Sequence, residues 1–254
     1  MIFVAAGTQD GRELAGYLLK MGYEVVASVV SAYGESLLKQ YQGIKINCEP
    51  LDVAGFVEYF KKHHIEAFVD ASHPYAVNAS QNAMDACHKA GIPYIRFERP
   101  ETPLKYDKAH YVDSYEAAAK KAAELGDSIF LTTGSRNLGV FAKAEALAGK
   151  RVICRILPEP GVVEQAISLG FTPASIVAMQ GPFSLEMNKA FFQQCNTQVV
   201  VTKNSGHTGG ADTKFAAAME LGLELVIIDR PKIEYDAEAD CNEGVLLLLK
   251  KQGI

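Results

Sequence analysis

The chain carries one structural pattern twice, and this repeat limits what it can fold into. The two copies span residues 67–100 and 199–231. In each copy a short apolar run enters a polar loop and a helical pattern follows. A second apolar run then leads into an Arg-Pro pair at the same distance from a preceding glycine. Strands that alternate with helices in this way are typical of a parallel sheet with crossover helices. The repeat therefore predicts two similar α/β domains.

The polar loops of the repeat are the first candidates for a functional site. They are Ser72-His73-Pro74-Tyr75 and Lys203-Asn204-Ser205-Gly206. In an open α/β sheet, ligands bind at the carboxyl ends of the strands. Both loops are expected at such ends, so we expect the two domains to share a cleft. The segment 99–108, which holds two prolines and alternating charges, is the candidate linker.

Composition excludes several classes of function. A net charge of −5 argues against a general nucleic-acid binder. The five cysteines are scattered, with neither a CxxC pair nor a Cys/His cluster at zinc spacing, so we expect free thiols and no metal site. No apolar run approaches the roughly 20 residues that a membrane span needs. The N-terminal apolar run lacks a basic region and indicates a strand rather than a signal peptide, so we expect a cytoplasmic protein.

The first strand pattern ends in a glycine turn that leads into a helix, at Gly7-Thr8-Gln9-Asp10-Gly11-Arg12. Backbone N–H groups and the helix dipole favour an anion at such a turn, which is typical of phosphate binding. The GxGxxG pattern is incomplete, because Gln9 and Arg12 stand where glycines would be needed. A tight turn without a ligand stays open as the alternative. Arg12 favours phosphate, since a guanidinium can donate two N–H bonds to it.

The second strand pattern ends without the acidic residue that holds the ribose of NAD in many dinucleotide-binding folds. The stretch is Ser28-Val29-Val30-Ser31-Ala32-Tyr33-Gly34, and its Ser31 hydroxyl is suited to a 2′-phosphate. This tip therefore favours NADPH over NADH.

Three further glycine-bearing loops follow strand patterns in the second half of the chain. They are Thr132-Thr133-Gly134-Ser135-Arg136, Gln180-Gly181-Pro182-Phe183-Ser184, and Lys203-Asn204-Ser205-Gly206 with the residues that follow it. Their hydroxyl and amide donors suit an anionic ligand, and three such loops are hard to explain as turns alone.

Two side chains in the polar loops of the repeat are suited to chemistry. His73 can donate to a carboxylate or carry a proton near neutral pH, and a structural histidine is the alternative. Lys203 can pair with a carboxylate, and a solvated loop charge is the alternative. Arg99 and Arg230 are interpreted as structural, as caps of loop carbonyls or as partners in interdomain ion pairs. The sequence contains no GxSxG or HExxH motif that would point to hydrolysis.

Taken together, these motifs resemble the precorrin-6A reductase family of cobalamin biosynthesis. The resemblance rests on Gly7-Thr8-x-x-Gly11-Arg12-x-Leu14-Ala15, Asp70-Ala71-Ser72-His73-Pro74-Tyr75-Ala76, Arg99-Pro100, Leu131-Thr132-Thr133-Gly134, Gln180-Gly181-Pro182-Phe183-Ser184 and Thr202-Lys203-x-Ser205-Gly206. The motifs occur in that family's order and cover nearly the whole chain. His207-Thr208 departs from the smaller residues expected in the last glycine loop.

The resemblance implies an α/β fold of two Rossmann-like parallel-sheet domains with a central cleft. We expect these domains at residues 1–100 and 101–254, with an exchange of the strands near 94–97 and 224–228 left open. It also implies that NADPH, or NADH, reduces one carbon–carbon double bond of a tetrapyrrole, precorrin-6A or its cobalt form. Hydride transfer needs no protein nucleophile, which fits a site without a catalytic triad.

The candidate site residues fall into three groups. The catalytic candidates are Lys203, His73 and Tyr75, and the proton donor is expected to be Lys203, Tyr75 or water. The candidates for cofactor binding are Gly7, Thr8, Gly11, Arg12, Ser31, Thr133, Gly134, Gln180, Gly181 and Ser184. The candidates for substrate binding are Ser72, His73, Arg136, Lys203, Ser205 and Gly206. Because the macrocycle bears many carboxylates, Arg12, His73, Arg136, Lys203 and His207 are expected to make the site positive.

Other classes of protein stay open at this point. A non-catalytic nucleotide-binding sensor would share the phosphate-type loops without needing His73 or Lys203. A nucleotide-sugar transferase is a further alternative, whereas a periplasmic binding protein is disfavoured by the N-terminus. The sequence leaves open which domain holds which ligand, whether the substrate carries cobalt, and the oligomeric state.

Overall fold

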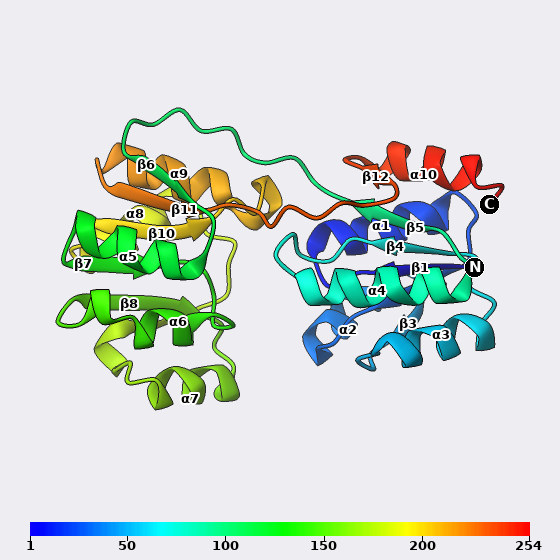
Figure 1. The fold of residues 1–254 in the computed structure, drawn as a ribbon, viewed down its shortest axis with the longest axis horizontal. Coiled ribbons are helices and arrows are strands. Elements are labelled where there is room, and N and C mark those ends of the chain that lie inside the picture. The colour runs from blue at the N-terminus through cyan, green and yellow to red at the C-terminus, as the bar shows by residue number, and fades with distance from the viewer. The chain divides into compact units, whose positions relative to one another are not determined.

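The computed structural model describes all 254 residues apart from the side chain of His207. The chain divides into two compact units, one of residues 1–100 with 231–254 and one of residues 101–230 (Figure 1). Each unit contains a six-stranded sheet whose recorded strand pairs are all parallel. These two sheets confirm the predicted α/β class.

The first unit alternates strands and helices along residues 1–97 and is completed by the end of the chain. Its elements are β1 (Ile2–Ala5), α1 (Gln9–Lys20), β2 (Val25–Ser28), α2 (Ala32–Leu38), β3 (Lys45–Asn47), α3 (Val53–Lys62), β4 (Ala67–Asp70), α4 (Val77–Ala90), β5 (Tyr94–Phe97), β12 (Glu238–Ala239) and α10 (Asn242–Lys251).

The second unit repeats this alternation. Its elements are β6 (Ala109–Val112), α5 (Tyr115–Leu125), β7 (Ser128–Leu131), α6 (Leu138–Lys143), β8 (Arg151–Ile156), α7 (Pro160–Ser168), β9 (Ile176–Ala178), α8 (Leu185–Gln194), β10 (Val199–Lys203), α9 (Ala211–Glu220) and β11 (Glu224–Ile228), with short 3-10 helices at Glu145–Leu147, Pro173–Ser175 and His207–Gly209. Among the described residues, every helix is too short or too polar to cross a membrane.

The two sheets have the same strand order. The first reads β12-β5-β4-β1-β2-β3 and the second reads β6-β11-β10-β7-β8-β9. With β1 and β7 taken as the first strand of each unit, both match the Rossmann order 3-2-1-4-5-6. The chain reverses direction across the sheet at the β1–β4 pair in one unit and at the β7–β10 pair in the other. Ligands of such folds bind outside the carboxyl ends of these strand pairs.

The sixth strand of each sheet comes from the other half of the sequence. β12 follows the second copy of the repeat but pairs with β5 of the first sheet, Glu238 opposite Arg96 and Ala239 opposite Phe97. β6 follows the first copy but pairs with β11 of the second sheet. Each Arg-Pro pair therefore marks the point where the chain leaves one unit for the other.

This exchange differs from the expected domain boundaries. Residues 231–254 belong with residues 1–100, whereas the sequence placed them in the second domain. The strands at 94–97 and 224–228 stay in the sheets of their own halves, so the exchanged strands are β6 and β12. The physical reason lies in α10, whose apolar residues are buried against the first sheet.

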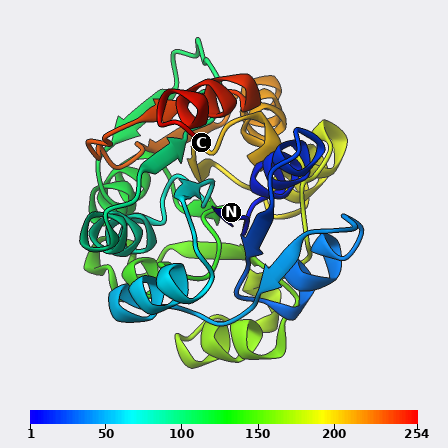
Figure 2. The same ribbon diagram turned by 90° about the vertical axis from the view of Figure 1, so that its right-hand side faces the viewer.

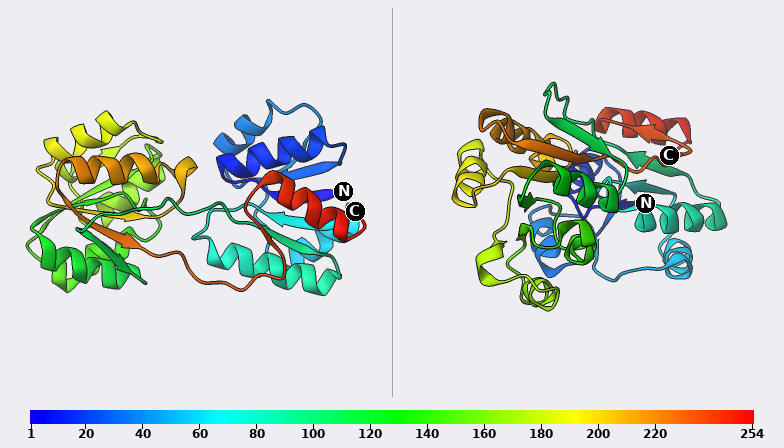
Figure 3. Two further views of the ribbon diagram at one scale, coloured as in Figure 1. Left: turned by 90° about the horizontal axis from the view of Figure 1, so that it is seen from above. Right: turned by 60° about the vertical axis from the view of Figure 1, so that its left-hand side comes forward.

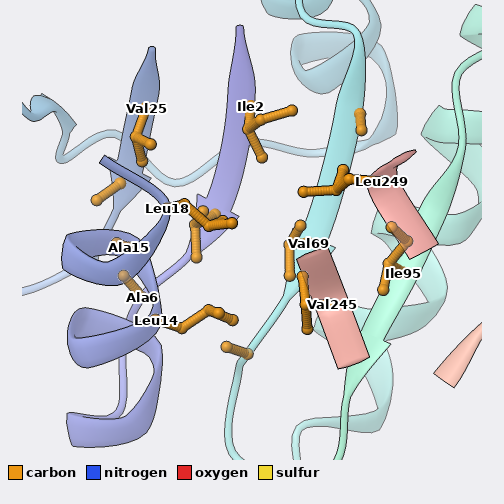
Figure 4. Close-up of a cluster of buried hydrophobic side chains, with 14 of the residues drawn as sticks. Ile2, Ala6, Leu14, Ala15, Leu18, Val25, Val69, Ile95, Val245 and Leu249 are labelled. Atoms are coloured by element: carbon orange, nitrogen blue, oxygen red, sulfur yellow. The ribbon is translucent and has the colours of Figure 1, made fainter. Parts of the chain in front are cut away.

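The first unit buries one apolar layer on each face of its sheet. On one face α1 and α10 supply Leu14, Leu18, Val245 and Leu249, which pack on strand residues such as Val69 (Figure 4). On the other face α3 and α4 cover a cluster of aromatic side chains that includes Phe3, Phe60 and Phe68. Figure 2 faces this unit, with α1 in blue and α10 in red on one side and α3 and α4 in cyan on the other. Burial on both faces explains why the strands read as continuous apolar runs.

The second unit has the same layered arrangement. Its residues Phe130, Val200 and Leu225 point from three neighbouring strands toward Phe192 of α8 and Phe215 of α9. In Figure 3 (left), α8 and α9 in yellow and orange lie on one side of this sheet and α5 in green lies on the other. Packing of the helices on the sheet holds the strands in place, and the strands in turn set the positions of the loops at their carboxyl ends.

The C-terminal helix offers a test of the exchange. Leu249 is 0% exposed, whereas Leu247 on the same helix is 60% exposed. Leu249→Ala is expected to lower the free energy of unfolding by about 2–5 kcal/mol, because it leaves a cavity in the first core. Leu247→Ala is expected to change it by less than about 0.5 kcal/mol. Chemical denaturation measures both, and hydrogen exchange should locate the loss in residues 1–100. A loss confined to residues 101–230 would contradict this arrangement.

Candidate functional site

In the first unit, the loops after β1 and β4 lie side by side because these strands pair, Ala5 opposite Asp70. Thr8 connects the two loops. Its hydroxyl donates to the carbonyl oxygen of Ala71 at 2.9 Å and accepts from the backbone N–H of Gly11 at 3.0 Å. Thr8 is thus both the N-cap of α1 and a bridge to the neighbouring loop.

Gly11 lets α1 approach this pair of loops closely. A Cβ atom at Gly11 would lie 3.0 Å from the Cα of Ala6 and 3.1 Å from the carbonyl oxygen of Ala71. Such contacts are tighter than most real Cβ contacts and would require backbone atoms to shift, so the position favours glycine. At Gly7, by contrast, a Cβ would meet nothing within 4 Å. Arg12 lies half-buried in the first turn of α1, at the same edge of the sheet.

Ser31 lies beyond β2, at the same edge of the first sheet. It is exposed, and its hydroxyl accepts from the backbone N–H of Gly34 at 3.0 Å as the N-cap of α2. The hydroxyl proton is still able to donate to an anion. The structure therefore gives Ser31 a capping role that the sequence did not predict, and its predicted role toward a 2′-phosphate stays a prediction.

The loop after β4 holds His73 and Tyr75 half-buried with their rings 5.6 Å apart. The backbone N–H of Tyr75 donates to His73 Nδ1 at 3.3 Å. Because Nδ1 accepts, the neutral imidazole carries its proton on Nε2. The ring can therefore offer an N–H donor from Nε2 when neutral.

Beneath this loop lies a buried ion pair that sequence reasoning missed. Asp70 ends β4 and pairs with Arg96 of β5, with Oδ1 3.2 Å from NH1 and both side chains almost fully buried. Burial disfavours the charged form of Asp70, but the Arg96 charge and the hydroxyls of Ser80 and Tyr94 outweigh it. Together they hold the pKa of Asp70 below its usual value. An arginine in the middle of an apolar strand pattern was the available signal, since a buried guanidinium needs a partner.

In the second unit, the loop after β7 contains an unpartnered hydroxyl. Thr133 is 5% exposed, and its Oγ1 has no hydrogen-bond partner within the described part of the chain. Gly134 follows with φ +79°, a conformation that glycine adopts readily. Thr132 of the same loop bonds to Val201 of β10, so this loop lies at the switch point of the second sheet. A polar ligand at this edge would satisfy the Thr133 hydroxyl.

Lys203 ends β10 beside this loop. Burial, and secondly the charge of Arg136, lowers the pKa of Lys203 from 10.5 to about 8. Arg136 itself is exposed, one turn before α6. The structure therefore brings together two of the cations predicted to bind carboxylates. The side chain of His207, also predicted there, lies outside the described residues.

The remaining predicted residues of the second unit lie in the loops after β9 and β10. Gln180 and Gly181 are exposed, and the exposed Ser184 caps α8 by accepting from the backbone N–H of Met187. Ser205 is 4% exposed and donates to the carbonyl oxygen of Gly209 at 3.3 Å. The structure thus gives Ser184 and Ser205 structural hydrogen bonds. Gly206 adopts φ +75°, which favours glycine.

A second buried arginine, also missed from the sequence, holds the loop after β9. Arg155 of β8 lies over the ring of Phe183 at 4.2 Å and donates to Oδ1 of Asn188 at 2.8 Å. Asn188 in turn donates to the carbonyl oxygens of Phe183 and Ser184. Burial lowers the pKa of Arg155 to about 10. This cluster fixes the start of α8.

The arginines of the two Arg-Pro pairs hold the chain where it leaves each unit. Arg99 pairs with Asp10 of α1. Arg230 donates from Nε to the carbonyl oxygen of Asn204 at 2.9 Å, which confirms the prediction that it caps a loop carbonyl. The side-chain amide of Asn204 also accepts from the backbone N–H of Thr102 at 3.0 Å and donates to its carbonyl oxygen at 2.9 Å.

The predicted residues thus gather at the carboxyl edge of the sheet to which each belongs. Gly7, Thr8, Gly11, Arg12, Ser31, Ser72, His73 and Tyr75 lie at that edge in the first unit, and Thr133, Gly134, Arg136, Gln180, Gly181, Ser184, Lys203, Ser205 and Gly206 lie there in the second. No group of His, Cys, Asp or Glu within the described residues has the arrangement of a metal site.

Comparison with known proteins decides the family. The model of the Precorrin-6x reductase CbiJ/CobK family matches residues 1–249. The chain belongs to this family. The match confirms the resemblance noted from the sequence and the function it implied, that of a precorrin-6A or cobalt-precorrin-6A reductase in cobalamin biosynthesis.

Members of the CbiJ/CobK family resemble the chain over nearly its full length. The cobalt-precorrin-6A reductase of Priestia megaterium is 41% identical, with 99% of each chain covered. That of Salmonella typhimurium is 34% identical, with 91% of this chain and 87% of the relative covered. Among solved structures, CobK precorrin-6A reductase is 27% identical and superposes with a TM-score of 0.80 over 99% of this chain and 97% of its own.

Proposed function

We propose that this protein reduces one carbon–carbon double bond of cobalt-precorrin-6A, with NADPH as the hydride donor. The proposal of the cobalt form is supported by the relatives of 41% and 34% identity, which are both named for it. The proposal of a nicotinamide is supported by two Rossmann-ordered sheets with polar loops at their switch points. The observation that carries it furthest is the buried, unpartnered hydroxyl of Thr133 at one of these points.

The residues at the edge of the second sheet fit such a cofactor. The Thr133 hydroxyl needs a polar partner, and Gly134 beside it leaves the backbone open to a ligand, because a Cβ there would meet nothing within 4 Å. Two other buried threonine hydroxyls, Thr102 and Thr197, also lack a described partner. Thr197 precedes β10 and lies away from this edge, and Thr102 belongs to the segment before β6 rather than to a loop that follows a strand of the second sheet. When bound, NADPH supplies the hydride.

The residues proposed to hold NADPH are those predicted from the sequence. They are Thr133, Gly134, Gln180, Gly181 and Ser184, with contributions from Gly7, Thr8, Gly11, Arg12 and Ser31. Their hydroxyl, amide and guanidinium groups donate hydrogen bonds, which suits the pyrophosphate and the 2′-phosphate. Ser31 carries the preference for NADPH over NADH.

The substrate is proposed to bind through its carboxylates. Its partners are Ser72, His73, Arg136, Lys203, Ser205 and Gly206, with Tyr75 beside His73. Cations that are partly removed from water pair more strongly with carboxylates than exposed cations do. The half-buried Lys203, with Arg136 next to it, is therefore the strongest of these anchors.

Lys203 is also the proposed proton donor. Reduction of a carbon–carbon double bond adds a hydride to one carbon and a proton to the other. A lysine with a pKa of about 8 is mostly protonated at neutral pH and gives up its proton more readily than an ordinary lysine. Tyr75 and water are the alternative proton donors.

The reaction itself is tested under anaerobic conditions. The purified protein is mixed with cobalt-precorrin-6A or metal-free precorrin-6A and with NADPH or NADH, and the nicotinamide and macrocycle absorbances are followed together. Both are expected to change in step, fastest with the cobalt form and NADPH. Cofactor binding without any turnover would reject the proposal in favour of a nucleotide-binding sensor.

The Thr133 hydroxyl provides a test of cofactor binding that does not depend on turnover. Thr133→Val keeps the side-chain shape and removes the hydroxyl, so the Kd for NADPH is expected to rise about tenfold or more, the value of a buried hydrogen bond to a charged group. The control is Thr197→Val, which removes another buried hydroxyl without a described partner, away from the carboxyl edge of the sheet. It should leave the Kd unchanged. Titration of NADPH fluorescence measures both. Equal Kd values in the two variants would remove Thr133 from the cofactor site.

The Lys203 proposal predicts a pH dependence. Because the acid must be protonated, kcat/KM is expected to be constant well below pH 8 and to fall as the pH rises through about 8. Lys203→Met should lower kcat by about 10²–10⁴-fold and abolish this alkaline limb. Arg136→Gln should move the limb to higher pH, because the Arg136 charge lowers the pKa of Lys203. An alkaline limb that persists unchanged in Lys203→Met would point to Tyr75 or water.

A further inference from the structure

Arg96 is the largest side chain among the fully buried residues of the described structure, at 1% exposed. It lies on β5 directly opposite Asp70 of β4. A guanidinium has five N–H donors, and removing it from water is costly unless they find partners. The hydrogen-bond partners of the Arg96 guanidinium therefore indicate its role in the structure.

One side of Arg96 is held by carboxylates. Its NH1 lies 3.2 Å from Oδ1 of Asp70, and its Nε and NH2 each lie 2.7 Å from Oε2 of Glu98. The guanidinium carbon also lies 5.5 Å from the ring centre of Tyr235, in the segment that returns to the first unit. These contacts neutralise the charge of Arg96 and fix its orientation.

Two of the same nitrogens also reach the loop after β4. NH1 donates to the hydroxyl of Ser72 at 3.2 Å, and NH2 donates to the carbonyl oxygen of Ser72 at 3.2 Å. Asp70 Oδ1 accepts from the backbone N–H of Ser72 at 2.9 Å. All three polar groups of Ser72 are therefore bound by the Asp70–Arg96 pair. An ion pair that only balanced charge would not need these additional hydrogen bonds to a loop residue.

Ser72 is the residue from which the Ser72-His73-Pro74-Tyr75 loop departs. Pro74 is buried and its ring restricts the backbone on both sides. The hydrogen bond from Tyr75 to His73 Nδ1 then fixes the histidine tautomer. A displacement at Ser72 would consequently turn both rings, because little freedom remains between them.

We propose that Arg96 is a positioning residue of the reductase, which acts through Ser72 to hold His73 and Tyr75 toward the macrocycle. The inference rests on the proposed function, because it takes the loop after β4 as a substrate-binding loop. It adds a residue that makes no contact with the substrate but sets the geometry of those that do. It also gives the charge of Arg96 a role beyond stabilising the fold.

Arg96→Lys separates positioning from simple charge balance. A lysine ammonium still neutralises Asp70, but its single nitrogen cannot reach Glu98 and both oxygens of Ser72 at once. The matched control is Glu98→Gln, which removes the charge of this carboxylate but keeps an Oε1 acceptor for Arg96, so the contacts of Arg96 to Ser72 are expected to stay. A second variant, Asp70→Asn/Arg96→Met, removes both charges. It should be more stable than Arg96→Met alone, since Asp70 is then no longer a buried charge without its partner.

Three readouts are made on each full-length variant and on the wild type: kcat/KM for the macrocycle, the Kd for NADPH, and the ¹⁵N chemical shifts of the His73 ring. In Arg96→Lys we expect kcat/KM to fall at least tenfold, the Kd for NADPH to stay within twofold, and the His73 shifts to move away from a single Nε2–H tautomer. Glu98→Gln should keep all three within twofold. The double variant should recover stability without recovering kcat/KM.

The positioning role would be refuted if Arg96→Lys kept kcat/KM within threefold and left the His73 shifts unchanged. It would also be refuted if the double variant regained stability and activity together, since charge balance alone would then suffice. Failure of the proposed function looks different, because the wild type itself would then leave the macrocycle unreduced. The His73 shifts still decide in that case whether Arg96 orders the loop.

Discussion

The pairing of the first with the fourth strand of each parallel sheet is the constraint on which the candidate site depends. β1 pairs with β4, and β7 pairs with β10. Parallel strands end at the same edge, so this pairing brings together loops that lie far apart in the sequence. The hydrogen bond from Thr8 to Ala71 and that from Thr132 to Val201 are local consequences of the same pairing. Without it, the polar loops would be isolated turns.

In each unit a buried arginine holds a loop that follows one of the strands. Arg96 binds both oxygens of Ser72 in the first unit, and Arg155 holds the start of α8 through Asn188 and Phe183 in the second. A planar guanidinium can bind several acceptors in fixed directions, which a lysine cannot do. A buried charge is a weak source of stability by itself. The main effect of these arginines is therefore to hold the loops in one defined conformation.

Sequence reasoning predicted the α/β class, the repeat and the edge at which the candidate residues gather, but it missed the exchange of β6 and β12. The repeat was visible because its strands are apolar and its glycine and Arg-Pro spacings agree. β12 is only the two residues Glu238 and Ala239, and β6 is partly exposed along its length. Such short or exposed segments carry no periodicity of their own, and pairing with β5 and β11 is what makes them strands. The partners of Arg96 and Arg155 were likewise hidden, because they lie on other elements.

By itself, the sequence determined the local patterns: buried strands, capped helices such as α1 with Thr8, and glycines such as Gly11 at the turn that leads into a helix. It also determined the family, through motifs spread over nearly the whole chain. Tertiary structure alone decided which sheet residues 231–254 complete, the lowered pKa of Lys203, and the hold of Arg96 on Ser72. The physical reason is that periodicity and turn chemistry act between neighbours in the chain. Burial, charge pairing and strand order depend on residues that only folding brings together.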